Sequence, residues 1–240
     1  KNWRAIIRDH NVVIIDASTS DEFALTDSGT EDDPFTPRFH WSPDSRYLVA
    51  IQEKKEQART VHFVESSPED QLQPKLHSFD YVKPGDPLDH PRPRLYDVNA
   101  RNQIAVDDAL FADPWRLSQF RWSQDSAQLS FIYNQRGHQV YRLVGIDAAT
   151  GTASTLIEEA PDTFVCYSSK TYYHPISSTG EVIWMSERDG WNHLYLFDHK
   201  TGELKNQITQ GEWVVREIDR IDDEARQIWF QAGGIDADQD

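Results

Sequence analysis

The residue types that most often perform catalysis are present, but their spacing fits no catalytic motif. None of the 11 glycines stands in a Gly-x-Ser-x-Gly elbow, which an α/β-hydrolase needs to expose its nucleophilic serine. The 9 histidines are scattered without the spacing of a zinc site, and the glycine patterns of phosphate and dinucleotide sites are missing. We therefore predict no catalytic residue, no metal and no cofactor in this chain. Histidines within strand patterns, such as His193, are expected to be hydrogen-bonded, and the single cysteine, Cys166, to be a buried structural thiol.

Two charged clusters are the candidate binding residues. Glu31, Asp32 and Asp33 lie in a connector, 27–37, that is rich in acidic and turn-forming residues. Arg92 and Arg94 flank a proline in segment 82–93 and are expected to dock a carboxylate of a partner subunit or domain. Four prolines in that segment disfavour a central strand and favour an extended arm.

Composition excludes some partners. The net charge is −16 and the pI is near 4.9, so a nucleic-acid backbone would be repelled. No apolar run approaches the roughly 18 residues of a membrane span, and no signal-peptide pattern is present. Because the sequence starts without Met and stops just after a predicted strand, we expect it to be a piece of a longer polypeptide.

The elements that position these residues are predicted to be strands, because one pattern returns along the chain. Segments 39–51 and 120–132 share an aromatic residue, Trp-Ser, an Asp-Ser turn and an apolar run, and looser copies occur at 178–185 and 223–230. The later copies are spaced close to the roughly 40 to 50 residues of a four-stranded propeller blade. The first interval is longer and calls for an insertion.

A second sequence pattern recurs along the chain together with the first. Asp16, Asp147 and Asp198 each end a predicted strand and begin a turn of the form Asp-x-x-Thr-small, which closes a hairpin with little strain. We therefore predict an all-β fold: a partial β-propeller of four-stranded antiparallel blades, from a seven- or eight-bladed whole. The predicted blade pieces are about 1–29, 39–110, 118–159, 164–210 and 213–234. Strands at 60–66 and 75–81 are assigned to the second of these blades.

Three segments resemble the N-terminal β-propeller of the dipeptidyl peptidase IV branch of prolyl oligopeptidase-like serine peptidases. Segment 186–196, Ser-Glu-Arg-Asp-Gly-Trp-Asn-His-Leu-Tyr-Leu, is similar to a family blade motif and is the strongest match. Segment 41–45, Trp-Ser-Pro-Asp-Ser, resembles a general opening of such blades. Segment 79–87 resembles the family's Tyr-Pro-Lys-Pro-Gly segment, with Val82 in place of the first proline. The order of the segments matches too, and together they cover nearly the whole chain.

This resemblance implies a function for the parent protein. A C-terminal α/β-hydrolase domain, absent here, would carry Ser, Asp and His as a serine-type dipeptidyl peptidase, while this piece would be inactive alone. The propeller would gate access and help position the amino terminus of short peptides. The resemblance also implies an arm that contributes to dimer contacts, so a homodimer is one expected assembly. It favours a periplasmic or extracellular location for the protein.

The resemblance also suggests a role for the acidic connector. Dipeptidyl peptidase IV holds the substrate's ammonium group with two glutamates, and Glu31, Asp32 and Asp33 occupy the corresponding connector. A carboxylate pair can recognise a chain end because an unpaired buried charge is costly. The Asp-Trp-x-Tyr motif that precedes these glutamates in the family is missing here. A second interpretation is therefore that the three residues form a solvated acidic turn with no binding role.

Two other functions fit the same sequence. A TolB-like binding propeller would act as a protein-interaction module with no hydrolase attached. The propeller of an oligopeptidase or acylaminoacyl peptidase would keep the hydrolase but not the restriction to free amino termini.

Overall fold

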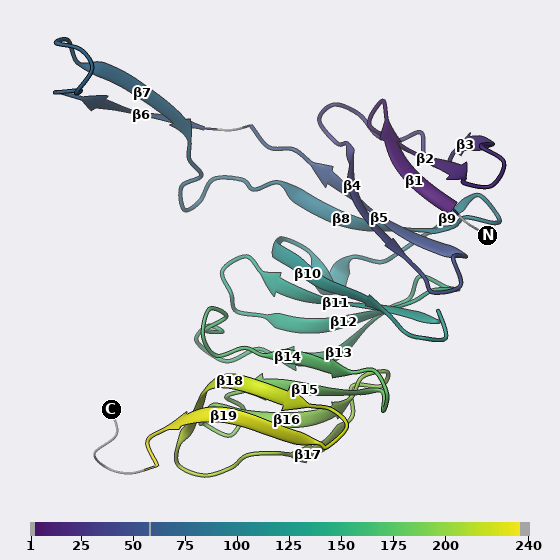
Figure 1. Ribbon diagram of the computed structural model, residues 1–240, viewed down its shortest axis with the longest axis vertical. Coiled ribbons are helices and arrows are strands. Elements are labelled where there is room, and N and C mark those ends of the chain that lie inside the picture. Colours follow the sequence, from purple (N-terminus) through teal and green to yellow (C-terminus); the bar gives the residue numbers. More distant parts are fainter. Residues whose placement is uncertain (1–2, 58, 236–240) are drawn as a thin grey trace. The chain divides into compact units, whose positions relative to one another are not determined.

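The computed structural model describes residues 3–57 and 59–235, and the regular structure within them is β-strand apart from one 3-10 turn, η1 (Ala109–Phe111) (Figure 1). A three-stranded sheet joins β1 (Trp3–Arg8), β2 (Asn11–Asp16) and β3 (Glu22–Ala24). A four-stranded sheet follows, with the strand order β4 (Phe35–Trp41), β5 (Tyr47–Lys54), β8 (His90–Asp97) and β9 (Asn102–Ile104).

The later sheets keep sequence order. One contains β10 (Pro114–Trp122), β11 (Gln128–Gln135), β12 (Tyr141–Asp147) and β13 (Ala153–Glu159). The next contains β14 (Tyr173–Ile176), β15 (Glu181–Ser186), β16 (His193–Asp198) and β17 (Leu204–Gln207). The last pairs β18 (Val214–Asp222) with β19 (Gln227–Gly233). These antiparallel four-stranded sheets are the blades of a partial β-propeller, as predicted.

The described residues form two compact units, which divide after Phe39, Val49 and Pro93. The first unit contains β1 to β3 and the β6–β7 hairpin, and the second contains β10 to β19.

The Trp-Ser-x-Asp-Ser pattern forms a tight turn held by its own side chains. After β4, Ser42 Oγ donates to Asp44 Oδ1 at 2.6 Å, and the N–H of Tyr47 donates to Ser42 Oγ at 2.8 Å. Ser123 Oγ and Asp125 Oδ1 repeat the first bond at 2.6 Å after β10. The hydroxyl and carboxylate satisfy backbone groups that the reversal leaves without a ladder partner.

The aromatic residue of the repeat joins neighbouring segments of the second unit. Trp122 Nε1 donates to the carbonyl of His40 at 3.0 Å, and its ring stacks on Tyr47 with centroids 6.2 Å apart. The N–H of Asp44 donates to Ser126 Oγ at 3.1 Å. The Trp-led turn after β10 therefore connects to the preceding copy of the same turn after β4.

The Asp-x-x-Thr-Gly turns require glycine for two reasons. Asp147 Oδ1 accepts backbone N–H groups two and three residues further along, at 3.0 and 2.8 Å, and hydrogen bonds from Thr150 are the main cause of a lowered pKa for Asp147. Gly151 has φ +74°, and a Cβ there would lie 2.0 Å from a backbone oxygen of Ala105. Gly202 has the same φ and a similarly close backbone neighbour. A larger residue would strain the turn and collide with the adjoining chain.

Successive sheets of the second unit pack face to face (Figure 1). The first inter-sheet core contains buried side chains from β11 to β13 and from β15 and β16: Ile132, Leu143, Leu156, Ile157, Val182, Trp184, Tyr195 and Phe197. A second core joins β14 to β16 with β18 and β19. All six residues of β15 are buried, so this strand is covered on both faces.

The strands at 60–66 and 75–81 do not join the blade to which the sequence assigned them. β6 (Thr60–Glu65) and β7 (Lys75–Asp80) pair only with each other as a two-stranded hairpin within the described residues (Figure 1). Phe63, Phe79 and Tyr81 are 51%, 49% and 52% exposed on it. The insertion predicted from the long first repeat interval is therefore a separate ribbon with exposed aromatic rings.

The expectation that prolines keep segment 82–93 out of a central strand is wrong at its end. β8 begins at His90 and lies between β5 and β9, although it contains Pro91 and Pro93. β9 pairs only with Leu95 to Asp97, so the prolines lie where β8 has no partner strand on that side. A missing N–H costs no ladder bond where the strand has an open side.

No helix among the described residues has the length and apolar character needed to cross a membrane.

Packing between sheets predicts which substitutions unfold the protein. Leu143 is fully buried in the first inter-sheet core, so Leu143→Ala should lower the free energy of unfolding by about 3 kcal/mol through lost burial and a cavity. Leu204→Ala, at a residue 46% exposed, should cost less than about 1 kcal/mol. Urea denaturation of both variants measures this, and equal losses would contradict the assigned core.

Candidate functional site

The predicted acidic connector forms a narrow turn in the first unit. The N–H of Thr30 donates to the carbonyl of Asp33 at 3.3 Å, and the reverse bond measures 3.2 Å. Glu31 and Asp32 are exposed at the tip of this turn. The turn is held near the end of β5, because the N–H of Lys55 donates to the carbonyl of Asp32 at 2.7 Å.

Asp33 differs from its two neighbours because it forms an ion pair with Arg92. The two side chains are 28% and 20% exposed, and Arg92 Nη2 donates to Asp33 Oδ1. Arg92 Nε is buried and has no hydrogen-bond partner among the described residues. The structure therefore brings together two residues that the sequence assigned to different roles. Docking of Arg92 and Arg94 on a partner stays a prediction.

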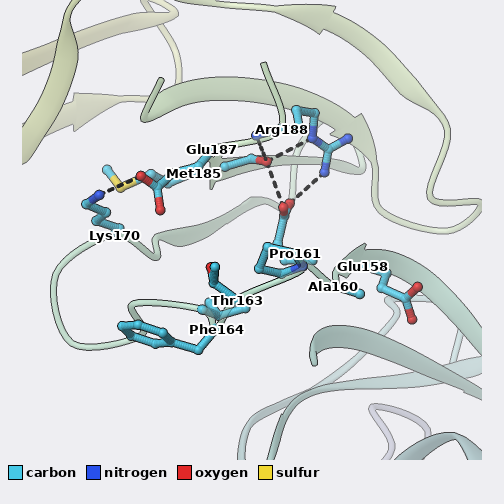
Figure 2. Close-up of a pocket in the computed structure, with 12 residues that line it drawn as sticks. Glu158, Ala160, Pro161, Thr163, Phe164, Lys170, Met185, Glu187 and Arg188 are labelled. Carbon is cyan, nitrogen blue, oxygen red and sulfur yellow. Dashed lines mark hydrogen bonds and ion pairs between the residues drawn. The ribbon is translucent and has the colours of Figure 1, made fainter. Parts of the chain in front are cut away.

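A hollow lies in the second unit, where the connector from β13 to β14 faces the end of β15 (Figure 2). Its volume is about 440 Å³. The connector contributes Pro161, Phe164 and Lys170, and the β15–β16 turn contributes Glu187 and Arg188 (Figure 2). We call this hollow the connector pocket.

The carboxylate of Glu159 is the polar centre of the connector pocket. It is only 14% exposed and accepts hydrogen bonds from Trp184 Nε1 at 2.8 Å, Ser186 Oγ at 2.8 Å and Arg188 Nη2 at 2.6 Å. A half-buried charge is tolerated when its oxygens are satisfied in this way. Glu159 therefore fixes Arg188 and the start of the β15–β16 turn.

Arg188 is held from a second side by aromatic rings. Its guanidinium carbon lies 5.0 Å from the ring centre of Tyr195 and 4.9 Å from that of Phe197, distances typical of cation–π contacts. Burial, followed by the neighbouring Asp189, raises the pKa of Tyr195 to about 12. Tyr195 is therefore a neutral platform for Arg188 at physiological pH.

The rim of the connector pocket combines an ion pair with apolar surface. Lys170 Nζ lies 2.5 Å from Glu187 Oε1, and the ring of Phe164 is 59% exposed (Figure 2). Met185 adds a buried thioether below them. Apolar surface beside a few charged and hydrogen-bonding groups is typical of ligand sites.

The connector pocket lacks the groups of a nucleophilic catalyst among its described residues. No histidine lines it, and Ser186 Oγ already donates to Glu159 and accepts the N–H of Arg188 at 3.1 Å. Cys166 lies on the same connector but does not line the pocket. It is half-buried rather than buried, with Sγ 3.2 Å from Ser169 Oγ, which lowers its pKa.

The remaining predicted polar residues are structural where the structure describes them. His193 is fully buried, with Nδ1 3.0 Å from Thr209 Oγ1 and Nε2 2.9 Å from the carbonyl of Gly211, so its predicted hydrogen-bonded role is confirmed. Within residues 3–57 and 59–235, no group of three or more His, Cys, Asp or Glu side chains is placed to hold a metal ion.

Sequence reasoning missed the connector pocket and found only part of its wall. Segment 186–196, which the sequence singles out only for its family resemblance, supplies Glu187 and Arg188 to this wall in a tight turn. Gly190 has φ +95°, as such a turn requires. Nothing in the sequence marks Glu159, which ends β13 in another blade and is 29 residues away from Arg188.

Comparison with known proteins gives one consistent result. Residues 1–239 match the protein family described as "Dipeptidyl peptidase IV (DPP IV) N-terminal region". A protein named "Probable dipeptidyl-aminopeptidase B", from Phaeosphaeria nodorum, is 26% identical over an alignment of 203 residues that covers 76% of this chain and 22% of that protein. The crystal structure of Porphyromonas gingivalis dipeptidyl peptidase 4 superposes with a TM-score of 0.70 at 19% identity, over 97% of this chain and 34% of that one. The chain thus spans about a fifth to a third of these relatives.

The network around Glu159 predicts unequal effects for two neighbouring glutamates. Glu159→Gln removes the charge that faces Arg188 in a partly buried place, so we expect a loss of about 2 kcal/mol in the free energy of unfolding. Glu158→Gln is the matched control, since Glu158 pairs with Arg142 at 39% exposure and should cost less than about 1 kcal/mol. Denaturant unfolding compares them, and a larger effect at Glu158 would refute the central place of Glu159.

Proposed function

This chain belongs to the family of dipeptidyl peptidase IV N-terminal regions, and from that premise we propose that it is the propeller portion of a serine exopeptidase that acts on short peptides. The family match along residues 1–239 is the observation that carries the proposal. In this proposal, peptide-bond cleavage belongs to an α/β-hydrolase domain with Ser, Asp and His. The propeller restricts access to short peptides and helps to position them.

The acidic connector is proposed to bind the substrate's ammonium group. Glu31 and Asp32 are the exposed carboxylates of the turn, and the Asp33–Arg92 ion pair anchors its base. Two carboxylates on an anchored turn offer an ammonium group charge-assisted hydrogen bonds without a large ordering cost.

The connector pocket, which lies wholly in the second unit, is proposed separately to contact side chains of short peptides. Phe164 offers exposed apolar surface, and the Lys170–Glu187 ion pair offers one charge of each sign. Arg188 is already engaged by Glu159, so it shapes the pocket rather than binding a substrate carboxylate. A peptide would therefore be selected by size and apolar contact more than by charge.

One observation favours a second candidate within the same enzyme class. Asp33 is paired with Arg92, and the family's Asp-Trp-x-Tyr motif is missing, so the match to the family's amine site is incomplete. An oligopeptidase or acylaminoacyl peptidase needs no amine site. Such an enzyme would cleave substrates with blocked amino termini equally well.

The two candidates predict different kinetics for the intact protein. The substrates are Xaa-Pro peptides prepared in pairs, one with a free and one with an acetylated amino terminus. The exopeptidase should prefer the free amine. The double variant Glu31→Gln with Asp32→Asn should raise KM for the free-amine substrate about tenfold, because the charge-assisted hydrogen bonds to the ammonium group are lost. The acetylated substrate should be unaffected. Glu69→Gln with Asp70→Asn, in the exposed turn of the hairpin, is the control. Equal turnover of both substrates by the unaltered enzyme would refute the proposed amine-binding site.

The β6–β7 hairpin is proposed to join two copies of the protein. A two-stranded hairpin is only marginally stable in water, yet this one exposes Phe63 and Phe79 instead of burying them. Its charged side chains already pair within the hairpin, Lys75 with Asp70 and His77 with Glu65, so the exposed aromatic rings are the surface left for a second copy related by a two-fold axis. Burying the aromatic rings at such an interface would stabilise both hairpins.

A serine in the aromatic face should therefore separate the copies. Phe79→Ser removes a half-exposed ring from the proposed contact, and we expect the molar mass measured by light scattering after gel filtration to fall by about half at micromolar concentration. Phe164→Ser is the control, because Phe164 is 59% exposed outside the hairpin and should leave the mass unchanged. A monomeric unaltered protein, or an unchanged Phe79→Ser dimer, would refute this interface.

A further inference from the structure

A second hollow, which we call the turn pocket, lies in the second unit among three turns. Its walls come from the β10–β11 turn, the β14–β15 turn and the residues that follow β16, and its volume is about 380 Å³. The lining residues are polar apart from Trp122 and Gly180. They include Arg121, Ser123, Asp125, Ser177, His199 and Lys200.

Arg121 carries a positive charge into the turn pocket that no carboxylate offsets. Its Nη1 donates to the neutral hydroxyl of Ser177 at 3.3 Å, and no described carboxylate lies within 4.0 Å of it. Several other arginines of this acidic chain are ion-paired, including Arg46 with Asp97 and Arg142 with Glu158. The exposed guanidinium of Arg121 has no described carboxylate partner, so a ligand's negative charge would be favoured beside it.

The other charges of the turn pocket cancel. Lys200 Nζ lies 3.3 Å from Asp125 Oδ2, and hydrogen bonds led by Ser123 lower the pKa of Asp125 to about 2, so this carboxylate is ionised at neutral pH. Burial, followed by the charge of Arg121, lowers the pKa of His199 and keeps its ring neutral. The charged side chains that line the pocket therefore sum to one positive charge.

Neutral hydroxyl groups fix the floor of the turn pocket. His199 Nε2 lies 3.1 Å from Ser130 Oγ and 3.2 Å from Tyr173 Oη. Ser177, whose hydroxyl contacts Arg121, belongs to the opposite turn. A ligand's oxygen atoms could therefore accept hydrogen bonds from the guanidinium group of Arg121 and the hydroxyl group of Ser177. The surrounding side chains are already held by hydrogen bonds, so binding would cost little conformational entropy.

We propose that the turn pocket binds a single carboxylate group at Arg121, such as the C-terminal carboxylate of a short peptide. The planar guanidinium matches a carboxylate with two parallel hydrogen bonds. The net charge of one suits a monoanion better than a doubly charged phosphate. This site requires neither the acidic connector nor the connector pocket, so it is independent of the exopeptidase proposal.

The test is ligand-observed saturation-transfer NMR on the intact protein. The probes are N-acetyl-Ala-Pro with a free carboxylate, the same dipeptide with a C-terminal amide, acetate and inorganic phosphate. We expect the free carboxylate to bind with a Kd of about 1 mM and the amide about tenfold more weakly. Acetate should compete with the peptide if the carboxylate alone is recognised, and failure to compete would restrict the site to peptides.

Three variants complete the experiment. Arg121→Gln should weaken carboxylate binding about tenfold, while Arg220→Gln, an equal charge change at an exposed arginine elsewhere, should not. Asp125→Asn keeps an oxygen acceptor in the turn but raises the local charge by one, so it should strengthen binding about threefold. This gain cannot come from a loss of folding. The site is overturned if amide and carboxylate bind alike, if Arg121→Gln has no effect, or if phosphate binds more tightly than the carboxylate.

Discussion

Face-to-face burial between successive sheets is the interaction on which the rest of this structure depends. The strands of a blade are short, and the central ones are apolar on both faces, as the fully buried β15 shows. Such a sheet is stable only when another sheet covers each face. Trp184, 1% exposed and packed against residues of β11 to β13, illustrates how one blade completes the core of its neighbour. The repeated residues therefore serve mainly to pack one sheet against the next.

Full burial of the strands confines polar chemistry to their ends. Glu159 ends β13 and meets Arg188 just beyond β15, while Arg121 lies near the end of β10 and faces the turn after β14. In both places residues from two adjacent blades form one wall of a hollow. A ligand bound there would contact side chains whose positions are fixed by the packing of the inter-sheet cores. Binding would then cost little conformational entropy of the protein.

The sequence predicted the features that depend on local chemistry. The Trp-Ser-x-Asp-Ser and Asp-x-x-Thr-Gly turns are visible because each needs particular side chains within five residues. The separation of β6 and β7 from their blade was not predicted, since alternating strands look the same in a blade and in a free hairpin. The Asp33–Arg92 and Glu159–Arg188 pairs were also missed, because they join residues that only the tertiary fold brings together.

We propose that this chain recognises and admits peptides while the reaction takes place elsewhere in the protein. Labelling the intact, active protein with a fluorophosphonate and locating the modified serine by mass spectrometry tests it directly. The account predicts complete loss of peptidase activity with one labelled serine outside residues 1–240. A labelled serine within this sequence, or activity that survives full labelling, would contradict it.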